Sequence, residues 1–284
     1  MKTIIFMFTI VIPTWNNIAH LKLCIESIRK NSAYRHQVVV HINEGTDGTL
    51  EWVKEAHIDH TFSDSNIGIC KAVNLAAVLA SQPYIVYMND DMYTCPGWDR
   101  AIMEKIQGLD TDLFLMSATM IEPRDTGNNC VVVADFGRDV PAFREQELCS
   151  SLPRLVKEDW NGSAWPPTVV ARKYWNIVGG YSVEFSPGMS SDDDFAMKMW
   201  HIGCRYFMGI GASKVYHFQA KSTGRIKKND GRRQFRMKWG FNQSTLNKHM
   251  IRRGTPYTGL LPEPDAGLIR KEKRRAWLKL LLNR

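Results

Sequence analysis

The alternation of buried-strand and helix patterns over about the first 90 residues constrains the fold most. The run 3–12 (TIIFMFTIVI) is apolar and rich in β-branched residues, as is typical of a parallel strand covered on both faces. Apolar positions spaced three and four apart then predict a helix over 18–31. Further strands are expected at 37–42, 58–63 and 84–88, and further helices at 49–56 and 69–81. The alternation predicts an α/β fold with a mostly parallel central sheet flanked by helices.

The rest of the chain has a less regular pattern. We expect helices over 99–107, 169–179 and 193–203, and strands over 113–121, 130–136, 205–208 and 214–218. After a Gly/Pro-containing linker at 254–267, residues 268–284 (LIRKEKRRAWLKLLLNR) predict an amphipathic helix. No apolar run is long enough to predict a transmembrane helix. The six cysteines form no Cys-x-x-Cys pair, which argues against a zinc knuckle or a thioredoxin motif. Six scattered cysteines in a chain of this length do not make a disulfide framework, so we expect reduced thiols in a cytoplasmic protein.

The net charge of +8 is unevenly distributed along the chain. From Lys221 onward there are 18 basic and 4 acidic residues, against 19 basic and 25 acidic residues before it. A basic segment of this kind favours an anionic partner. The terminal helix could bind the inner face of a membrane peripherally, or it could pack on the body of the protein. We expect no nucleic-acid partner, because no recognised motif accompanies the charge.

An acidic segment follows the fourth predicted strand. Asn89, Asp90 and Asp91 come where the strand ends, and ligands of parallel α/β sheets bind at such ends. Adjacent carboxylates repel one another unless a cation or a donor is present, and hard oxygen ligands suit Mg²⁺ or Mn²⁺. The segment therefore indicates either a metal site or a solvated turn.

Three consecutive carboxylates, Asp192, Asp193 and Asp194, precede another predicted helix. Negative charge is stabilised at a helix N-terminus, which is one explanation for them. The other is that one carboxylate acts as a general base toward an acceptor hydroxyl. His217 is either structural or a metal ligand, and Trp165 either packs in the core or stacks on an acceptor sugar.

The order of these segments resembles that of inverting family-two glycosyltransferases with the GT-A fold. The resemblance covers about residues 8–223. It is carried by 9–16 (TIVIPTWN), 43–49 (NEGTDGT), Asn66-x-Gly68, 89–91 (NDD), 96–98 (PGW), 179–181 (GGY) and 191–195 (SDDDF). It implies a GT-A domain over 1–223, with a donor-binding part at about 1–95 and an acceptor-binding part at about 96–223. A basic, helical C-terminal extension would follow at 224–284.

The resemblance also implies roles for single residues. Pro13, Thr14 and Asn16 would hold the nucleotide, and Glu44, which stands where Asp is usual, would contact its base or ribose. Lys71 could reach a donor phosphate or lie on a solvated helix face. Further donor-binding candidates are Asn66, Gly68, Asn74, Asn89 and Asp90.

By the same resemblance, Asp91 would be the strongest metal ligand, and His217, followed by Ser222-Thr223, would complete the metal site. Asp192 would be the catalytic base, although the family's preceding Glu is Ser191 here, so that a shift of register to Asp193 stays open. On the acceptor side we expect Trp165 and Asp193.

The implied activity is transfer of a sugar from a nucleotide-sugar donor to an acceptor hydroxyl, with inversion and with Mn²⁺ or Mg²⁺. A UDP-sugar is favoured as donor, GDP and dTDP stay open, and the acceptor would be a glycan or a lipid-linked molecule. One alternative is a nucleotidyltransferase, which normally has a Gly-rich phosphate loop where this chain has 13–16 (PTWN). Another is an inactive protein that binds nucleotide sugars.

Overall fold

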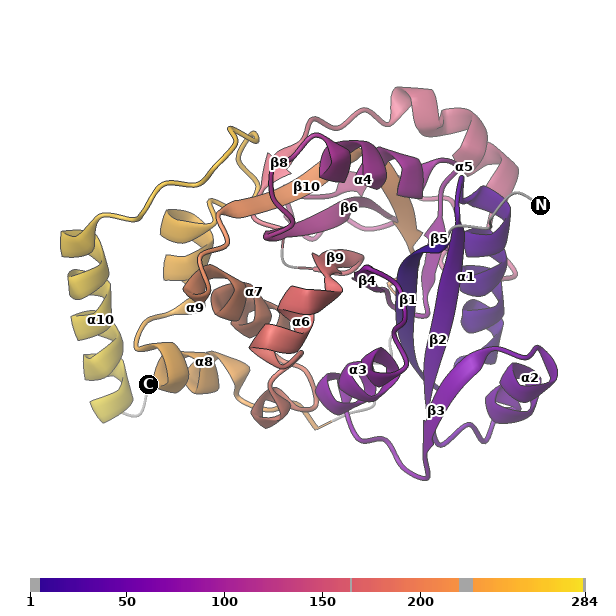
Figure 1. The fold of residues 1–284 in the computed structure, drawn as a ribbon, viewed down its shortest axis with the longest axis horizontal. Helices are drawn as coiled ribbons and strands as arrows, with labels where there is room; N and C mark the ends of the chain where they lie inside the picture. The colour runs from indigo at the N-terminus through magenta and orange to yellow at the C-terminus, as the bar shows by residue number, and fades with distance from the viewer. Residues whose placement is uncertain (1–5, 164, 220–226, 283–284) are drawn as a thin grey trace.

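The computed structural model describes residues 6–163, 165–219 and 227–282. Ten strands form one sheet in the order β3-β2-β1-β4-β9-β6-β10-β5, with β7 beside β6 and β8 beside β10 (Figure 1). Strands β1 to β4 and the β6–β10 pair run parallel, whereas β9 and β5 are antiparallel to their neighbours. The predicted α/β fold with a mostly parallel sheet and flanking helices is confirmed.

The elements follow one another along the chain. The strands are β1 (Phe6–Trp15), β2 (Arg35–Asn43), β3 (Asp59–Ser63), β4 (Tyr84–Tyr87), β5 (Met92–Thr94), β6 (Phe114–Glu122), β7 (Val132–Val133), β8 (Trp160–Asn161), β9 (Thr168–Ala171) and β10 (Tyr206–His217). The helices are α1 (Ile18–Asn31), α2 (Thr49–Glu55), α3 (Ile69–Val78), α4 (Trp98–Gln107), α5 (Glu145–Ser151), α6 (Arg172–Val178), α7 (Ser191–His201), α8 (Gly231–Trp239), α9 (Gln243–Thr245) and α10 (Ala266–Leu281). Short helical turns lie at η1 (Leu152–Arg154), η2 (Val183–Phe185) and η4 (Leu246–Met250).

Helices cover the sheet on both faces. From β1, Phe8, Ile10 and Ile12 are fully buried in the cluster formed with α1, α2 and α4, and Val11 is fully buried in the cluster formed with α3, α6 and α7. A strand buried on both faces is apolar at nearly every position, which explains the apolar run near the start of the chain. The one polar residue within it, Thr9, is also buried and donates its hydroxyl to Gln37 Oε1 at 2.7 Å. The strand continues past Pro13 to Trp15. There it still pairs with β2, whereas its pairing with β4 has ended at Val11.

Two sequence predictions in the second half are corrected by the structure. Residues 169–171, the start of the helix predicted at 169–179, belong instead to β9, which pairs antiparallel with β4 and β6. A short apolar run does not distinguish a strand from a buried helix, so its neighbours decide the outcome. The two strands predicted at 205–208 and 214–218 are one strand, β10, with an irregular register beside β6 between Ile210 and Lys214.

The segment after residue 226 adds to the same core. Side chains from α8 to the loop before α10 are buried in the cluster that contains α3, α6 and α7, namely Phe235, Phe241, Leu246, Met250, Ile251 and Leu261. The predicted linker is hydrogen-bonded to the body, through Asn161 N to Thr255 O at 2.8 Å and Leu261 N to Arg205 O at 3.0 Å. The predicted C-terminal helix is present as α10, which lies against α8 at the edge of the molecule (Figure 1). Across the ranges described above, no helix combines the length and apolarity needed to cross a bilayer.

Candidate active site

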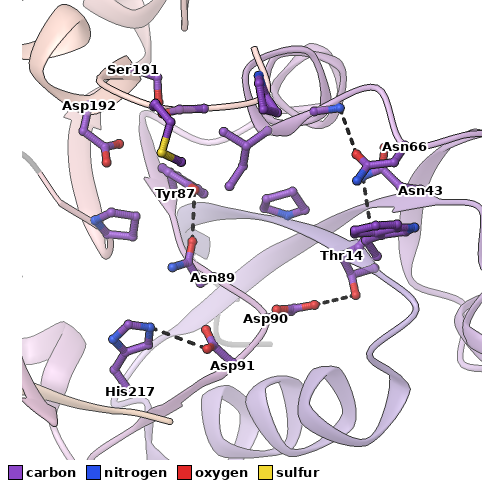
Figure 2. A pocket seen from close by; sticks show the side chains of 18 of the residues that line it. Thr14, Asn43, Asn66, Tyr87, Asn89, Asp90, Asp91, Ser191, Asp192 and His217 are labelled. Atoms are coloured by element: carbon purple, nitrogen blue, oxygen red, sulfur yellow. Dashed lines mark hydrogen bonds and ion pairs between the residues drawn. The ribbon is translucent and has the colours of Figure 1, made fainter. Parts of the chain in front are cut away.

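A cavity of about 410 Å³ lies at the carboxyl ends of β1 and β4 (Figure 2). The N-terminus of α3 and the segment that leads into α7 form its opposite side. Its walls contain nine of the residues that the sequence singles out, which are Pro13, Thr14, Asn66, Gly68, Asn89, Asp90, Asp91, Asp192 and His217. The candidates that do not line it are Asn16, Glu44, Lys71, Asn74, Trp165 and Asp193. Stretches from all along the chain therefore meet in one place.

The acidic segment after β4 directs its three side chains to different partners. The Tyr87 hydroxyl donates to Asn89 Oδ1 at 3.0 Å, and the Thr14 hydroxyl donates to Asp90 Oδ2 at 2.6 Å. Asp91 is 6% exposed and faces His217, with Oδ2 and Nε2 separated by 3.5 Å. The first two side chains are thus tied to strands β4 and β1, while Asp91 and His217 form a pair at the lower edge of the cavity in Figure 2.

The Asp91–His217 pair is completed by Glu122, at the end of β6. Glu122 Oε1 lies 2.8 Å from His217 Nδ1. Burial alone would lower the pKa of His217, but the two carboxylates outweigh it and raise the pKa to about 10. Without a cation, the imidazole is therefore held as an imidazolium between two acids.

This arrangement suits a divalent cation that takes only some of its ligands from the protein. Metal-binding histidines usually donate their second ring N–H to a carboxylate, as His217 Nδ1 can to Glu122, which leaves Nε2 for the metal beside Asp91. Among the described residues there is no group of three His, Cys, Asp or Glu side chains that could hold a metal. Mg²⁺ commonly binds one or two carboxylates and completes its coordination with substrate phosphates. The residues present suit such a shared site.

The carboxylates at the start of α7 have three different environments. Asp192 faces the cavity and accepts a hydrogen bond from the Tyr181 hydroxyl at 2.9 Å. Asp193 binds the Arg253 guanidinium, with Nη2 and Oδ1 2.5 Å apart, and Gln243 Nε2, also at 2.5 Å. Asp194 is fully buried, where it accepts from Trp239 Nε1 at 2.9 Å and pairs with Lys238. Only the first of the three points into the cavity.

Burial raises the pKa of Asp192 to about 7, although the Tyr181 hydrogen bond opposes the shift. The charge of Asp193 raises this pKa further, and the charge of Arg253 lowers it. A carboxylate with a pKa near neutrality is suited to take a proton from a hydroxyl group, because it combines basicity with a substantial deprotonated fraction.

Asn74 and Tyr181 form a support behind Asp192. Asn74 Nδ2 donates to Tyr181 O at 2.7 Å, and Tyr181 N donates to Asn74 Oδ1 at 2.8 Å. The Tyr181 ring stacks on Phe195 of α7 with centroids 5.0 Å apart. A Cβ at Gly180 would lie 2.3 Å from Asn74 Oδ1, so only glycine permits this contact. Asn74, a predicted nucleotide contact, here positions the tyrosine that binds the predicted base.

The loops that follow β1, β2 and β3 form one wall of the cavity and are hydrogen-bonded to one another. Asn43, on β2, donates to Thr14 O at 3.2 Å and accepts from Ile67 N at 3.0 Å. Asn66 Oδ1 accepts from Gly68 N at 2.9 Å, and Gly68 has a φ of +78° with Pro187 too close for a side chain. These contacts fix the backbone of the loops on this side of the cavity, which faces the acidic segment 89–91.

The other candidates lie near the cavity without lining it. Asn16 Nδ2 donates to Glu44 Oε2 at 3.1 Å, and both residues have positive φ values, of 46° and 63°. Lys71 is exposed on α3. Trp165 is half-buried with the Arg253 guanidinium 4.2 Å from its ring centroid, and its neighbour Pro166 lines the cavity. Ser222 and Thr223 lie outside the described residues.

Sequence reasoning assigns no role to several residues that support the site. Glu122, Tyr87 and Arg253 are not part of any motif, and Glu122 and Arg253 are remote in sequence from their partners. Tyr181 lies within the Gly-Gly-Tyr motif, so a signal exists for it. Trp15 and Asn43 also line the cavity, and both fall inside the segments that carry the resemblance.

Solved structures with a similar architecture include GT-A glycosyltransferases. The structure of S. aureus TarS 1–349 superposes with a TM-score of 0.56 at 16% identity, over 75% of this chain and 60% of that chain. TarS 1–349 in complex with UDP-GlcNAc gives a TM-score of 0.54 at 15% identity, over 76% and 61% of the two chains. GalNAc-T7 with UDP, GalNAc and Mn²⁺ gives 0.55 at 16% identity, over 79% and 44%. The chain therefore has the GT-A fold of these glycosyltransferases.

The sequence comparison locates the similarity in the first half of the chain. Residues 9–129 match the family model of glycosyl transferase family 2. The resemblance to family-two glycosyltransferases with the GT-A fold is thereby confirmed. The matched segment contains the cavity residues from Pro13 to Asp91 but neither Asp192 nor His217. The chain spans about 60% of the TarS 1–349 structure, and no curated protein matches it significantly by sequence.

Proposed function

We propose that this protein transfers a sugar from a nucleotide-sugar donor to an acceptor hydroxyl, with inversion at the anomeric carbon. The observation that carries the proposal is the meeting in one cavity of the Asp91–His217 pair and Asp192, which has a pKa raised to about 7, chiefly by burial. Transfer of this kind requires charge stabilisation at the leaving diphosphate and a base at the attacking hydroxyl. The cavity offers groups suited to each task.

The proposed step proceeds by single displacement. Asp192 accepts the proton of the acceptor hydroxyl as its oxygen bonds to the anomeric carbon, and the bond from that carbon to the diphosphate oxygen breaks. The nucleoside diphosphate leaves with the bonding electron pair. A divalent cation bound at Asp91 and His217 would stabilise the negative charge that collects on the diphosphate. Tyr181 keeps Asp192 oriented toward the cavity.

A UDP-sugar is the favoured donor, and Mn²⁺ or Mg²⁺ the favoured cation. Among the similar structures, TarS 1–349 is solved in complex with UDP-GlcNAc, and GalNAc-T7 is solved with UDP, GalNAc and Mn²⁺. The loops of Pro13–Thr14, Asn43 and Asn66 would hold the nucleotide, and the side that contains Asp192 would receive a glycan or a lipid-linked acceptor. All six cysteines are free thiols, which supports a cytoplasmic location.

The test is release of nucleoside diphosphate from UDP-GlcNAc, UDP-GalNAc, a GDP-sugar and a dTDP-sugar, with and without Mn²⁺. We expect slow release from a UDP-sugar that depends on Mn²⁺ and is lost in Asp91→Asn. Binding of the nucleotide sugar without any release would instead indicate an inactive binding protein. Formation of pyrophosphate from a nucleoside triphosphate and a sugar phosphate would identify a nucleotidyltransferase.

A further inference from the structure

Helix α10 exposes an apolar surface that no described residue covers. Trp277, Leu278, Leu281 and Leu282, in its last two turns, are between 52% and 66% exposed. The opposite side of the helix faces the body, where Ala276 is fully buried and Glu272 and Leu280 are half-buried at spacings of four residues. Packing against the body therefore accounts for one face of α10 and leaves the other unexplained.

We call the second face of α10 its outer face and define it by Arg270, Lys271, Arg274, Trp277, Leu278 and Leu281. These positions recur at three- and four-residue spacing, so they lie on one side of the helix. Its first half is cationic and its second half is apolar, and all six side chains are exposed. The single acidic residue of the helix, Glu272, is held on the inner side by Arg275 at 2.6 Å and by Thr245 at 3.5 Å.

We propose that the outer face of α10 docks on a bilayer that contains anionic lipid. Arginine and lysine would meet the phosphates of the headgroups, and Trp277 and the leucines would enter the boundary with the acyl chains. Such a partner satisfies both halves of the face at once. The proposal does not depend on the transfer reaction, because binding is measured without any donor.

A second copy of the chain or a nucleic acid would satisfy at most one half of the outer face. A second copy in parallel orientation would place cations against cations, and a second copy in antiparallel orientation would place cations against leucines. A nucleic acid would pair with Arg270, Lys271 and Arg274 but would leave the leucines in water. The charge pattern therefore favours the lipid surface.

The position of the helix is compatible with docking of the intact protein. α10 lies at the edge of the molecule, outside α8 (Figure 1), and the six side chains of its outer face are exposed. Asp265 caps the helix by accepting from Leu268 N at 2.6 Å, so the helix is formed before it meets a membrane.

The test is flotation of the full chain with vesicles of equal parts phosphatidylglycerol and phosphatidylcholine, compared with phosphatidylcholine alone. We expect binding to the anionic vesicles that weakens as salt is added. The double variants Leu278→Ser/Leu281→Ser and Lys271→Glu/Arg274→Glu should each lower partitioning by roughly tenfold. Val78→Ser, an apolar residue 77% exposed on α3, and Arg100→Glu, an exposed cation on α4, should bind like the wild type.

Absence of binding by the wild type, or equal binding by the leucine double variant, would overturn the proposal. So would a dimer in solution that the same variants abolish, or binding to RNA without binding to vesicles. Brominated lipid provides a second readout, because it should quench part of the tryptophan fluorescence in the wild type but less in Trp277→Phe. Equal quenching in both proteins would contradict insertion of the helix.

Discussion

The two sides of the cavity are built in different ways. The proposed donor side consists of loops that follow β1, β2, β3 and β4, all within the first 91 residues, and these loops are hydrogen-bonded to one another. The side that contains Asp192 is instead supported from the C-terminal segment, where Arg253 and Gln243 hold Asp193 and Trp239 holds Asp194. The proposed donor side is built from strand ends that lie next to one another in the sheet, and the side that contains Asp192 depends on packing of the C-terminal segment against the start of α7.

The largest expected effect tests whether the two sides of the cavity have different roles. Asp192→Asn should lower turnover by about 10³-fold, because it removes the general base. Donor binding should stay within about twofold of the wild type, because the donor contacts lie on the other side. Turnover and calorimetric donor binding are measured together, with surface Asp112→Asn as the matched control. If the variant lost donor binding in proportion to turnover, the assignment of donor contacts and general base to different sides of the cavity would be wrong.

The complementary change is Asp91→Asn. It should lower turnover by about 10²-fold and should also remove the part of donor affinity that depends on Mn²⁺, because this carboxylate would hold the cation that stabilises the charge of the diphosphate. Calorimetric titration of UDP with and without Mn²⁺ measures the effect. If Mn²⁺ strengthens UDP binding equally in the variant and the wild type, Asp91 does not hold the cation.

Arg253 tests whether the C-terminal segment supports the acceptor side. Arg253→Met should lower turnover by roughly tenfold, because it leaves Asp193 as a charge without its cation next to the base. Since the Arg253 charge lowers the pKa of Asp192, the acidic limb of the pH–rate profile should move to higher pH in the variant. Exposed Arg252→Met is the neighbouring control. A fall in turnover with an unmoved acidic limb would point to a purely structural role.

The smallest effect concerns stability. Burial raises the pKa of Asp192 to about 7 in the folded protein, so between about pH 4 and 7 the folded state binds more protons than the unfolded state. Stability should therefore fall as pH rises through this window. Asp192→Asn removes that penalty, and its melting temperature should exceed that of the wild type by a few degrees at pH 8, with no difference at pH 4. A gain confined to pH 4 would contradict the raised pKa.

The same contrast explains how much could be predicted from the sequence. The alternating pattern predicts β1 to β4 and the helices between them, because each buried strand carries its own apolar run. Asp90 and Asp91 are found by the same logic, since polar residues after such strands meet at one edge of the sheet. The donor side is therefore readable from short segments.

The other side could not be read in this way. Glu122 lies 95 residues from His217, and Arg253 lies 60 residues from Asp193, so no local pattern links either pair. The apolar run of β9 is too short to distinguish a strand from a helix. Its conformation is decided by pairing with β4 and β6, the strands on either side. Three consecutive aspartates also look alike in sequence, whereas Tyr181, Arg253 and Trp239 give them different environments.

The central claim is that Asp192 acts by a single displacement across the sugar from the departing diphosphate. The most direct measurement is the anomeric configuration of the first product, followed by proton NMR as an α-linked UDP-sugar is consumed in the presence of Mn²⁺. The account predicts a β-configured product with the wild type and almost no product with Asp192→Asn. A first product that keeps the α configuration would contradict it.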